Sequence, residues 1–226
     1  MIERLRVGPI GENAYIVVCA GTSGGACVLV DPGDEAARIL SFLDSRALAP
    51  SYIVVTHGHL DHTSAIPELL DAWTRRGRTV RLAVHALDAA YFGETGETTN
   101  RTLFAAIGAL GYFKAYWRPM PEPDLLLNDG DLVPGSPLRV IHTPGHTAGS
   151  ICLYDREAAL LLSGDTLFQG GVGRTDGPDS DPRLLESSLA RLFSLPAETT
   201  VLPGHGEATS IGSEIGTQGM GDRTAI

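Results

Sequence analysis

The chain reads THGHLDH over residues 56–62, directly after an apolar, β-branched run that predicts a buried strand. His57 and His59 are two residues apart, so in an extended loop both imidazole rings project to one side. Asp61 and His62 follow at once and add a second pair of side chains at a neighbouring point. Because imidazole and carboxylate groups suit zinc, iron or manganese, this stretch predicts a metal site that follows a strand.

Three further motifs place a His or an Asp after a short apolar run, bracketed by Gly or Pro. They are TPGHTAGS at 143–150 with His146, SGDTLF at 163–168 with Asp165, and PGHG at 203–206 with His205. A rigid sheet presents side chains in this way from the loops at one edge. A lone histidine in a turn is ordinarily structural, but four such motifs together indicate a metal centre. The candidate ligands are His57, His59, Asp61, His62, His146, Asp165 and His205.

Short β-rich runs alternate with turns and helical patterns along the whole chain. Strands are predicted over Arg4–Val7, Ala14–Cys19, Cys27–Val30, Tyr52–Val55, Val80–Val84, Leu138–His142, Ser150–Tyr154, Ala159–Ser163 and Thr200–Leu202. Helices are predicted over Glu35–Leu43, from Thr63 or Ser64 to Arg75, and over Asp181–Phe193. Strands interleaved with helices favour a layered α/β fold, formed by residues 1–226 as one domain.

Two segments depart from this layered pattern. Residues 86–123 hold half of the aromatic residues, and Leu103, Ile107 and Leu110 recur at helical spacing, which predicts a helical insertion. Three roles for the insertion are open: a wall of the substrate site, a contact in a homodimer, or core packing. Residues 211–226 are rich in Gly, Ser and Thr, and we expect them to form a loosely ordered tail.

Charge and cysteine content exclude several kinds of partner. Acidic residues outnumber basic ones 27 to 17, the formal net charge is −10, and Lys114 is the only lysine. Because nucleic acids and anionic membranes are bound by clustered Lys and Arg, we expect neither as a partner. No apolar run is long enough to span a bilayer, and residues 1–6 do not read as the start of a signal peptide. With three scattered cysteines, the chain is predicted to be cytoplasmic.

The four motifs resemble those of the metallo-β-lactamase superfamily over almost the whole chain. Within that superfamily the chain is most similar to the glyoxalase II branch, and especially to short, single-domain hydroxyacylglutathione hydrolases. The Gly-Arg-Thr-Asp run at 173–176 points the same way. The resemblance implies a four-layer αββα sandwich of the metallo-β-lactamase type, with the helical insertion added and the metals at one edge.

Carried over motif by motif, the resemblance implies two divalent metal ions, with zinc expected first and iron or manganese also suited to the ligands. The first metal would be held by His57, His59 and His146, the second by Asp61, His62 and His205, and Asp165 would bridge the two. A carboxylate has two oxygens and can bridge cations about 3.5–4 Å apart, as two-metal hydrolases require.

The implied function is hydrolysis of a small-molecule thioester, with glutathione as one candidate thiol carrier. A metal-bound hydroxide would attack the thioester carbonyl, since a metal lowers the pKa of bound water to roughly 7. The thiolate leaves readily, so no strong general acid is required, and Asp61 is expected to orient the nucleophile as a catalytic residue. β-Lactamases of this superfamily usually carry Arg or Cys where this chain has His62 and Asp165, so we do not expect antibiotic hydrolysis.

The alternative function is that of a single-iron sulfur (persulfide) dioxygenase of the same superfamily. Such enzymes resemble this chain around Asp165 and in the Gly-Arg-Thr-Asp run. Their single iron would here be held by His57, His146 and Asp165. The candidate ligands for both metals are intact in the sequence, so the choice between the two functions stays open at this point.

Four polar residues near the motifs are not assigned to the metal site. His85 follows the predicted strand Val80–Val84 and is interpreted as a structural histidine. His142 lies on the predicted strand before the ligand loop and is interpreted as a core residue or as one that supports a ligand. Arg174 and Asp176 are expected to form a buried ion pair that braces the metal loop, and a role of Arg174 as a substrate clamp stays open.

Overall fold

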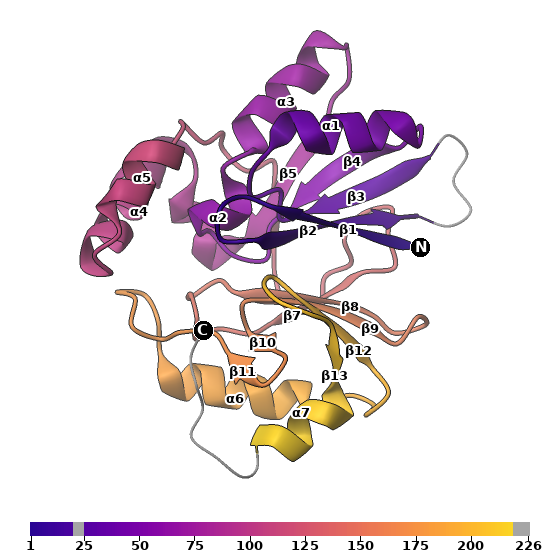
Figure 1. Ribbon diagram of the computed structural model, residues 1–226, viewed down its shortest axis with the longest axis vertical. Helices are drawn as coiled ribbons and strands as arrows, with labels where there is room; N and C mark the ends of the chain where they lie inside the picture. The colour runs from indigo at the N-terminus through magenta and orange to yellow at the C-terminus, as the bar shows by residue number, and fades with distance from the viewer. Residues whose placement is uncertain (20–24, 219–226) are drawn as a thin grey trace.

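The computed structural model describes residues 1–19 and 25–218, and shows two facing β-sheets with helices on their outer faces (Figure 1). The first sheet has the strand order β1-β2-β3-β4-β5-β6, with strands spanning Ile2–Val7, Glu12–Val18, Ala26–Val30, Ala49–Val54, Arg81–His85 and Leu125–Leu127. The second has the order β13-β12-β9-β8-β7, with strands spanning Thr209–Ser210, Thr200–Pro203, Leu160–Gly164, Ile151–Asp155 and Arg139–His142. Each predicted strand coincides with an observed one, and the predicted αββα sandwich is confirmed.

Amphipathic helices complete the four layers. Helices α1 (Ala36–Ser45) and α3 (Ile66–Arg75) cover the first sheet, and α6 (Pro182–Leu192) and α7 (Ile211–Gln218) cover the second (Figure 1). On α3 the residues Ile66, Leu69, Ala72 and Trp73 are buried, which is the spacing of one helix face. Helix α6 begins after Asp181, whose carboxylate accepts hydrogen bonds from two backbone amides of the first turn.

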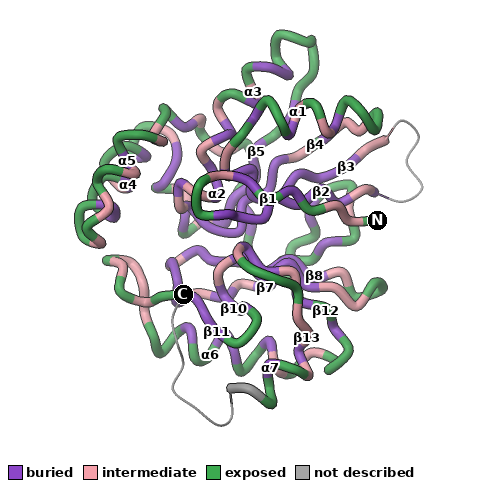
Figure 2. The backbone as a smooth tube through the Cα atoms, in the orientation of Figure 1, coloured by how far each residue is buried: buried purple, intermediate pink, exposed green. Residues whose placement is uncertain are grey.

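The core between the sheets consists mainly of small β-branched and leucine side chains. The first sheet contributes Val28, Val30 and Val54, and the second contributes Val140, Leu153 and Leu162. These residues are at most 1% exposed, and Figure 2 shows most of the backbone of the central strands as buried. Because successive strand residues point to opposite faces, the residues between them pack outward against the helices.

Strand direction brings the predicted metal motifs to one edge. In the second sheet β12 runs parallel to β9, β8 is antiparallel to β9, and β7 is antiparallel to β8. The carboxyl ends of β7, β9 and β12 therefore lie at the same edge, and the motifs of His146, Asp165 and His205 follow those ends. In the first sheet, the THGHLDH motif follows β4 in the same way.

The insertion over residues 86–123 is helical, but not as one helix. It contains two short 3-10 turns (Ala86–Tyr91 and Gly93–Thr95) followed by α4 (Gly96–Ala106) and α5 (Leu110–Tyr116). The expected continuous helical spacing through Leu103, Ile107 and Leu110 is therefore wrong. Gly108 has φ +74°, and the Ala109 amide donates to the Phe104 carbonyl at 2.7 Å. A glycine in the left-handed region is a common helix terminator, and it ends α4 here.

The prediction of a loosely ordered tail is wrong for residues 211–218, which form α7, and residues 219–226 lie outside the described part of the chain. Ile211 is fully buried. Glu214 is 2% exposed, and its carboxylate accepts hydrogen bonds from the Gly170 amide (2.9 Å) and the Thr209 hydroxyl (2.6 Å). These contacts offset the weak helix propensity of a Gly- and Ser-rich segment.

Among the described residues, no helix has the length and apolar character to cross a membrane.

Candidate metal centre

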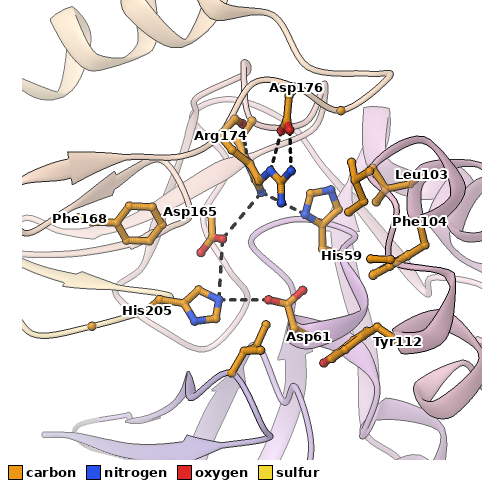
Figure 3. A pocket seen from close by; sticks show the side chains of 16 residues that line it. His59, Asp61, Leu103, Phe104, Tyr112, Asp165, Phe168, Arg174, Asp176 and His205 are labelled. Atoms are coloured by element: carbon orange, nitrogen blue, oxygen red, sulfur yellow. Dashed lines mark hydrogen bonds and ion pairs between the residues drawn. The ribbon is translucent and has the colours of Figure 1, made fainter. Parts of the chain in front are cut away.

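All seven candidate ligands converge at the shared edge of the two sheets. His57 lies in the loop after β4, His59 precedes the single turn α2 (Leu60–Thr63), and Asp61 and His62 lie within that turn. The other three come from the loops after β7, β9 and β12. Figure 3 shows His59, Asp61, Asp165 and His205 facing one cavity, which has a volume of about 530 Å³.

The loop that carries His146 depends on a glycine. Gly145 has φ +139°, and a Cβ atom at this position would lie 2.3 Å from the backbone nitrogen of Leu185 in α6. The Asp181 amide donates to the Gly145 carbonyl at 2.9 Å, which ties the loop to the start of α6. Only glycine adopts this conformation without strain and also leaves room for the helix.

Three histidines form the first group of ligand atoms. Nitrogen atoms of His57, His59 and His146 all lie within 4.8 Å of one another. Nε2 of His146 and Nδ1 of His59 lie 3.0 Å apart. The other ring nitrogen of His146, Nδ1, lies 2.9 Å from the backbone carbonyl oxygen of Arg174, which fixes the orientation of the ring.

A second group contains one carboxylate and two imidazoles. The ligand atoms of Asp61, His62 and His205 also lie within 4.8 Å of one another. His205 Nε2 is 3.1 Å from Asp61 Oδ2, and His62 Nε2 is 3.6 Å from the same oxygen. These are the two sets of residues that the sequence resemblance assigned to two separate metals.

Asp165 lies between the two groups. Its Oδ1 atom is 3.3 Å from His62 Nε2, and its Oδ2 atom is 3.8 Å from His146 Nε2 and 3.9 Å from His205 Nε2. One carboxylate thus reaches histidines of both groups, which is the position that a bridging ligand requires.

Several buried atoms in the cluster have no hydrogen-bond partner among the described residues. They are Nε2 of His57, His59 and His62, and Oδ1 of Asp165. Buried polar atoms in folded proteins are nearly always paired, so a cluster of unpaired nitrogen and carboxylate oxygen atoms at one point requires an occupant. A donor set of imidazoles and carboxylates fits borderline divalent cations. The residues present therefore fit the metal ions that the sequence implies.

Opposite charges and burial strongly shift the pKa values in the cluster. Burial lowers the pKa of His59 to about 3, with a further decrease from His146. Burial also lowers the pKa of His62, but Asp165 and Asp61 outweigh it and raise that pKa well above its usual value. For Asp61, burial raises the pKa, but the charge of His62 and the hydrogen bond with His205 outweigh burial and lower the pKa to about 2. The carboxylates are thus held ionised and attract positive charge.

Two buried carboxylates behind His62 were missed by the sequence analysis. Asp31 accepts hydrogen bonds from the amide (2.7 Å) and hydroxyl (2.6 Å) of Thr56, and its Oδ2 lies 3.1 Å from His62 Nδ1. Glu12 Oε1 lies 3.8 Å from the same nitrogen, and Glu12 is 1% exposed. A carboxylate on the outer nitrogen of a ligating histidine orients the ring and raises its basicity. The signal for Asp31 was its place directly after β3, at the same edge as the motifs.

Asp88 was also missed, and it joins the loops of His57 and His146. Its carboxylate accepts hydrogen bonds from the Gly58 amide (2.8 Å), the Gly149 amide (2.6 Å) and the Thr147 hydroxyl (2.8 Å). Asp88 is 1% exposed, and burial raises its pKa to about 6 although these three donors act in the opposite direction. No metal-ligand spacing in the sequence marks this residue, because its partners lie on two other segments of the chain.

Replacing Asp88 with asparagine should weaken metal binding at the first group by about 10–100-fold, the usual effect of losing a group that supports metal ligands. The asparagine amide would place a donor against one of the two backbone N–H groups. Titration of metal-free protein with zinc, followed by calorimetry, measures this change. Asp124→Asn is the control, because Asp124 also accepts a hydrogen bond from a backbone amide, that of Leu82 (2.8 Å). Leu82 lies near the start of β5, whereas Asp88 follows the end of that strand, beside the metal cluster. Equal affinity in Asp88→Asn and the unmodified protein would contradict this role.

The expected buried pair of Arg174 and Asp176 is only partly correct. The two side chains do form a double hydrogen bond, with both N–O distances 2.5 Å, but they are 44% and 61% exposed and they line the cavity. The backbone carbonyl of Arg174, rather than its guanidinium, contacts His146. Arg174 follows the two-stranded pair β10–β11 (Leu167–Phe168 and Gly171–Val172). It lies at the rim of the cavity, so its side chain reaches solvent.

His85 and His142 lie outside the cluster, in line with their interpretation as structural residues. Their rings stack on one another with centroids 4.1 Å apart. His85 Nδ1 accepts a hydrogen bond from the Leu87 amide at 3.3 Å, and His142 Nε2 lies 2.9 Å from the Ala148 carbonyl oxygen. Neither residue is in a group of ligand atoms among the described residues.

Comparison with known families agrees with this geometry. The sequence profile of the metallo-β-lactamase superfamily matches residues 7–205, from the first strand to the last candidate ligand. The chain belongs to this superfamily. Its members are largely metal-dependent hydrolases, and the His/Asp cluster of the present chain is of the metal-binding kind that goes with this fold.

Curated relatives match nearly the whole chain. A probable metallo-hydrolase of Bacillus subtilis, YqgX, is 33% identical over 94% of this chain and 93% of its own length. The hydroxyacylglutathione hydrolase GloC of Haemophilus influenzae is 31% identical over 82% of each chain. The predicted likeness to the glyoxalase II branch is confirmed by this second relative.

Three solved structures share the fold over almost all of this chain. TTHA1623, in a di-iron-bound form, is 36% identical with a TM-score of 0.78, covering 95% of this chain and 98% of its own. The B3 metallo-β-lactamase BLEG-1 is 32% identical with a TM-score of 0.80, covering 96% and 97%. ETHE1 from Myxococcus xanthus is 26% identical with a TM-score of 0.70, covering 95% and 81%.

Proposed function

We propose that this protein is a hydrolase of small-molecule thioesters that works with two divalent metal ions. The observation that supports the proposal is the pair of three-residue ligand groups with Asp165 between them, all opening on one cavity. The similarity to GloC, a hydroxyacylglutathione hydrolase, supports the thioester as the substrate bond.

The proposed ligands follow the two groups. One metal would be held by His57, His59 and His146, the other by Asp61, His62 and His205, with Asp165 shared. Zinc is the first choice for this donor set, and iron or manganese is chemically compatible with it. The di-iron form of TTHA1623 supports iron as the second choice and supports a count of two metals.

The metal ions, when bound, would supply an ionised water at neutral pH and polarise the carbonyl of the substrate. The protein residues would hold and orient the reactants. Asp61 lines the cavity, and its Oδ2 lies 3.1 Å from His205 Nε2, so the carboxylate would lie where it can accept a hydrogen bond from the attacking water. The thiolate is a stable leaving group, and the reaction requires no strong acid on the opposite side.

The second candidate is a persulfide dioxygenase with a single iron on His57, His146 and Asp165. Its support is that Asp165 lies 3.8 Å from His146, so these residues also converge, and that the fold of ETHE1 matches. We rank it second because Asp61, His62 and His205 form a complete group with no role in that scheme.

Two assays on the same metal-loaded protein separate these functions. We expect thiol release from a panel of lactoyl thioesters, measured with a thiol reagent, and no oxygen uptake with glutathione persulfide. Oxygen uptake without thiol release would contradict the proposal and support the dioxygenase. A chromogenic β-lactam is included because of the similarity to BLEG-1, and faster turnover of that compound than of any thioester would also contradict the proposal.

A further inference from the structure

The cavity beside the metal cluster has one polar side and several apolar walls. The polar side is formed by His59, Asp61, His146, Asp165 and His205. The apolar lining comes from the insertion, from the turn after β1 and from β10, and consists of Leu103, Phe104, Ile107, Ala109, Tyr112, Ile10 and Phe168. Figure 3 shows Leu103, Phe104 and Tyr112 on one side of the cavity and Phe168 on the other, with the carboxylates between them.

The apolar wall on the insertion is packed and aromatic. The rings of Phe104 and Tyr112 stack with centroids 5.6 Å apart and planes 8° apart, and Tyr112 stacks on Tyr116 at 4.4 Å. Leu103 and Phe104 are 2% and 6% exposed, so their positions are set by the core beneath them. A preformed apolar wall of this kind favours an apolar or aromatic group of a ligand, because contact removes apolar surface from water.

The lining of the cavity offers no free cationic side chain of Lys or Arg for an anionic carrier, among the described residues. Among the described residues that line it, Arg174 is the only Lys or Arg, and both its hydrogen bonds at 2.5 Å go to Asp176. The insertion has three basic residues, and none of them lines the cavity: Arg101 pairs with Glu97, Arg118 donates to the carbonyls of Ala115 and Trp117, and Lys114 also lies outside the lining. Glutathione carries two carboxylates, and placing them against an apolar wall without a cationic partner is costly.

We propose that the site takes thioesters whose non-reacting part is apolar, such as an aryl or alkyl group, and that it discriminates against glutathione as the thiol carrier. This inference rests on the proposed thioesterase function. The acyl carbonyl lies at the polar side of the cavity, and the apolar group lies against the wall formed by Leu103, Phe104 and Tyr112. The Arg174–Asp176 pair is electrically neutral and leaves the rim without net attraction for an anion.

The test compares two substrates that share the lactoyl group and differ in the thiol: S-lactoylglutathione and the S-lactoyl ester of 2-phenylethanethiol. We expect kcat/KM to be about 10–100-fold higher for the phenylethyl ester, the range for burial of one aromatic group. Calorimetry with the matching thioethers, in which a methylene replaces the carbonyl, should rank the two compounds in the same way, with tighter binding of the phenylethyl thioether. A kcat/KM for S-lactoylglutathione that equals or exceeds that of the phenylethyl ester would overturn the inference.

A pair of charge variants tests the role of the cavity lining. Asp176→Asn frees Arg174 inside the cavity, and should raise kcat/KM for S-lactoylglutathione relative to the phenylethyl ester by about 3–10-fold. Glu97→Gln removes the same charge and frees Arg101 outside the cavity, so it should leave that ratio unchanged. An equal change in both variants would contradict the assignment of selectivity to the cavity.

Failure of the two proposals can be told apart. A protein that binds the phenylethyl thioether but hydrolyses neither ester contradicts the proposed thioesterase function. A protein that hydrolyses both esters but prefers S-lactoylglutathione retains that function and contradicts the inference about the substrate.

Discussion

Replacing Asp165 with alanine should lower kcat/KM for thioester hydrolysis by about 10³-fold, the upper end of the effect of removing one electrostatic group from an active site. Within residues 1–19 and 25–218, Asp165 is the one carboxylate within 4 Å of histidines of both ligand groups. Its loss therefore weakens both metal positions together, and the metal content of the purified variant should fall below two per chain.

Asp155→Ala is a suitable control for this variant. Asp155 ends β8, at the edge of the second sheet opposite Asp165, and accepts hydrogen bonds from the amides of Glu157 and Ala158 at 3.0 Å. It should keep full activity and metal content. Circular dichroism of both variants checks that they are folded. Activity of Asp165→Ala within about tenfold of the unmodified protein would show that the carboxylate is not shared by the metals.

The second large effect is expected from His59→Ala and Asp61→Ala, made separately. A two-metal hydrolase uses His59 at one metal and Asp61 at the other, so each change should lower kcat/KM by about 10²–10³-fold. In the single-iron scheme neither residue is a ligand, and each variant should keep one bound iron and its oxygen uptake. The pair of variants therefore distinguishes the two candidate functions through residues on the same loop.

His142→Ala is the matched histidine control for these variants. His142 lies at the end of β7, stacks on His85, and is in no group of ligand atoms among the described residues. Its replacement should leave the metal content unchanged. Loss of activity in His142→Ala as large as in His59→Ala would mean that the assay reports general damage to the fold.

The candidate ligands could be predicted from sequence because each of the four motifs that carry them follows an apolar run. A buried strand is recognisable from its composition, and a Gly- or Pro-flanked His or Asp after it lies at an edge of the sheet. Parallel and antiparallel pairing then brings His146, Asp165 and His205 to the same edge. The assignment of these residues as ligands remains a proposal, which the metal measurements test.

The supporting carboxylates could not be predicted in the same way. Asp88 contacts Gly58 and Gly149, which lie 30 and 61 residues away along the chain, and no local pattern encodes those distances. Glu12 is a buried carboxylate at the start of β2, where composition favours an exposed position. The formation of α7 likewise depends on contacts with other segments, which override local propensity, whereas the break at Gly108 is a local glycine terminator that the helical spacing of the apolar residues did not reveal.

Quantification of metal on purified, reconstituted protein tests the two-metal site most directly. Two divalent metal ions per chain are predicted, together with the loss of one of them in Asp61→Ala, because Asp61 belongs to only one of the two ligand groups. A single iron per chain, retained in full by Asp61→Ala, would contradict the two-metal site and the thioesterase function proposed from it.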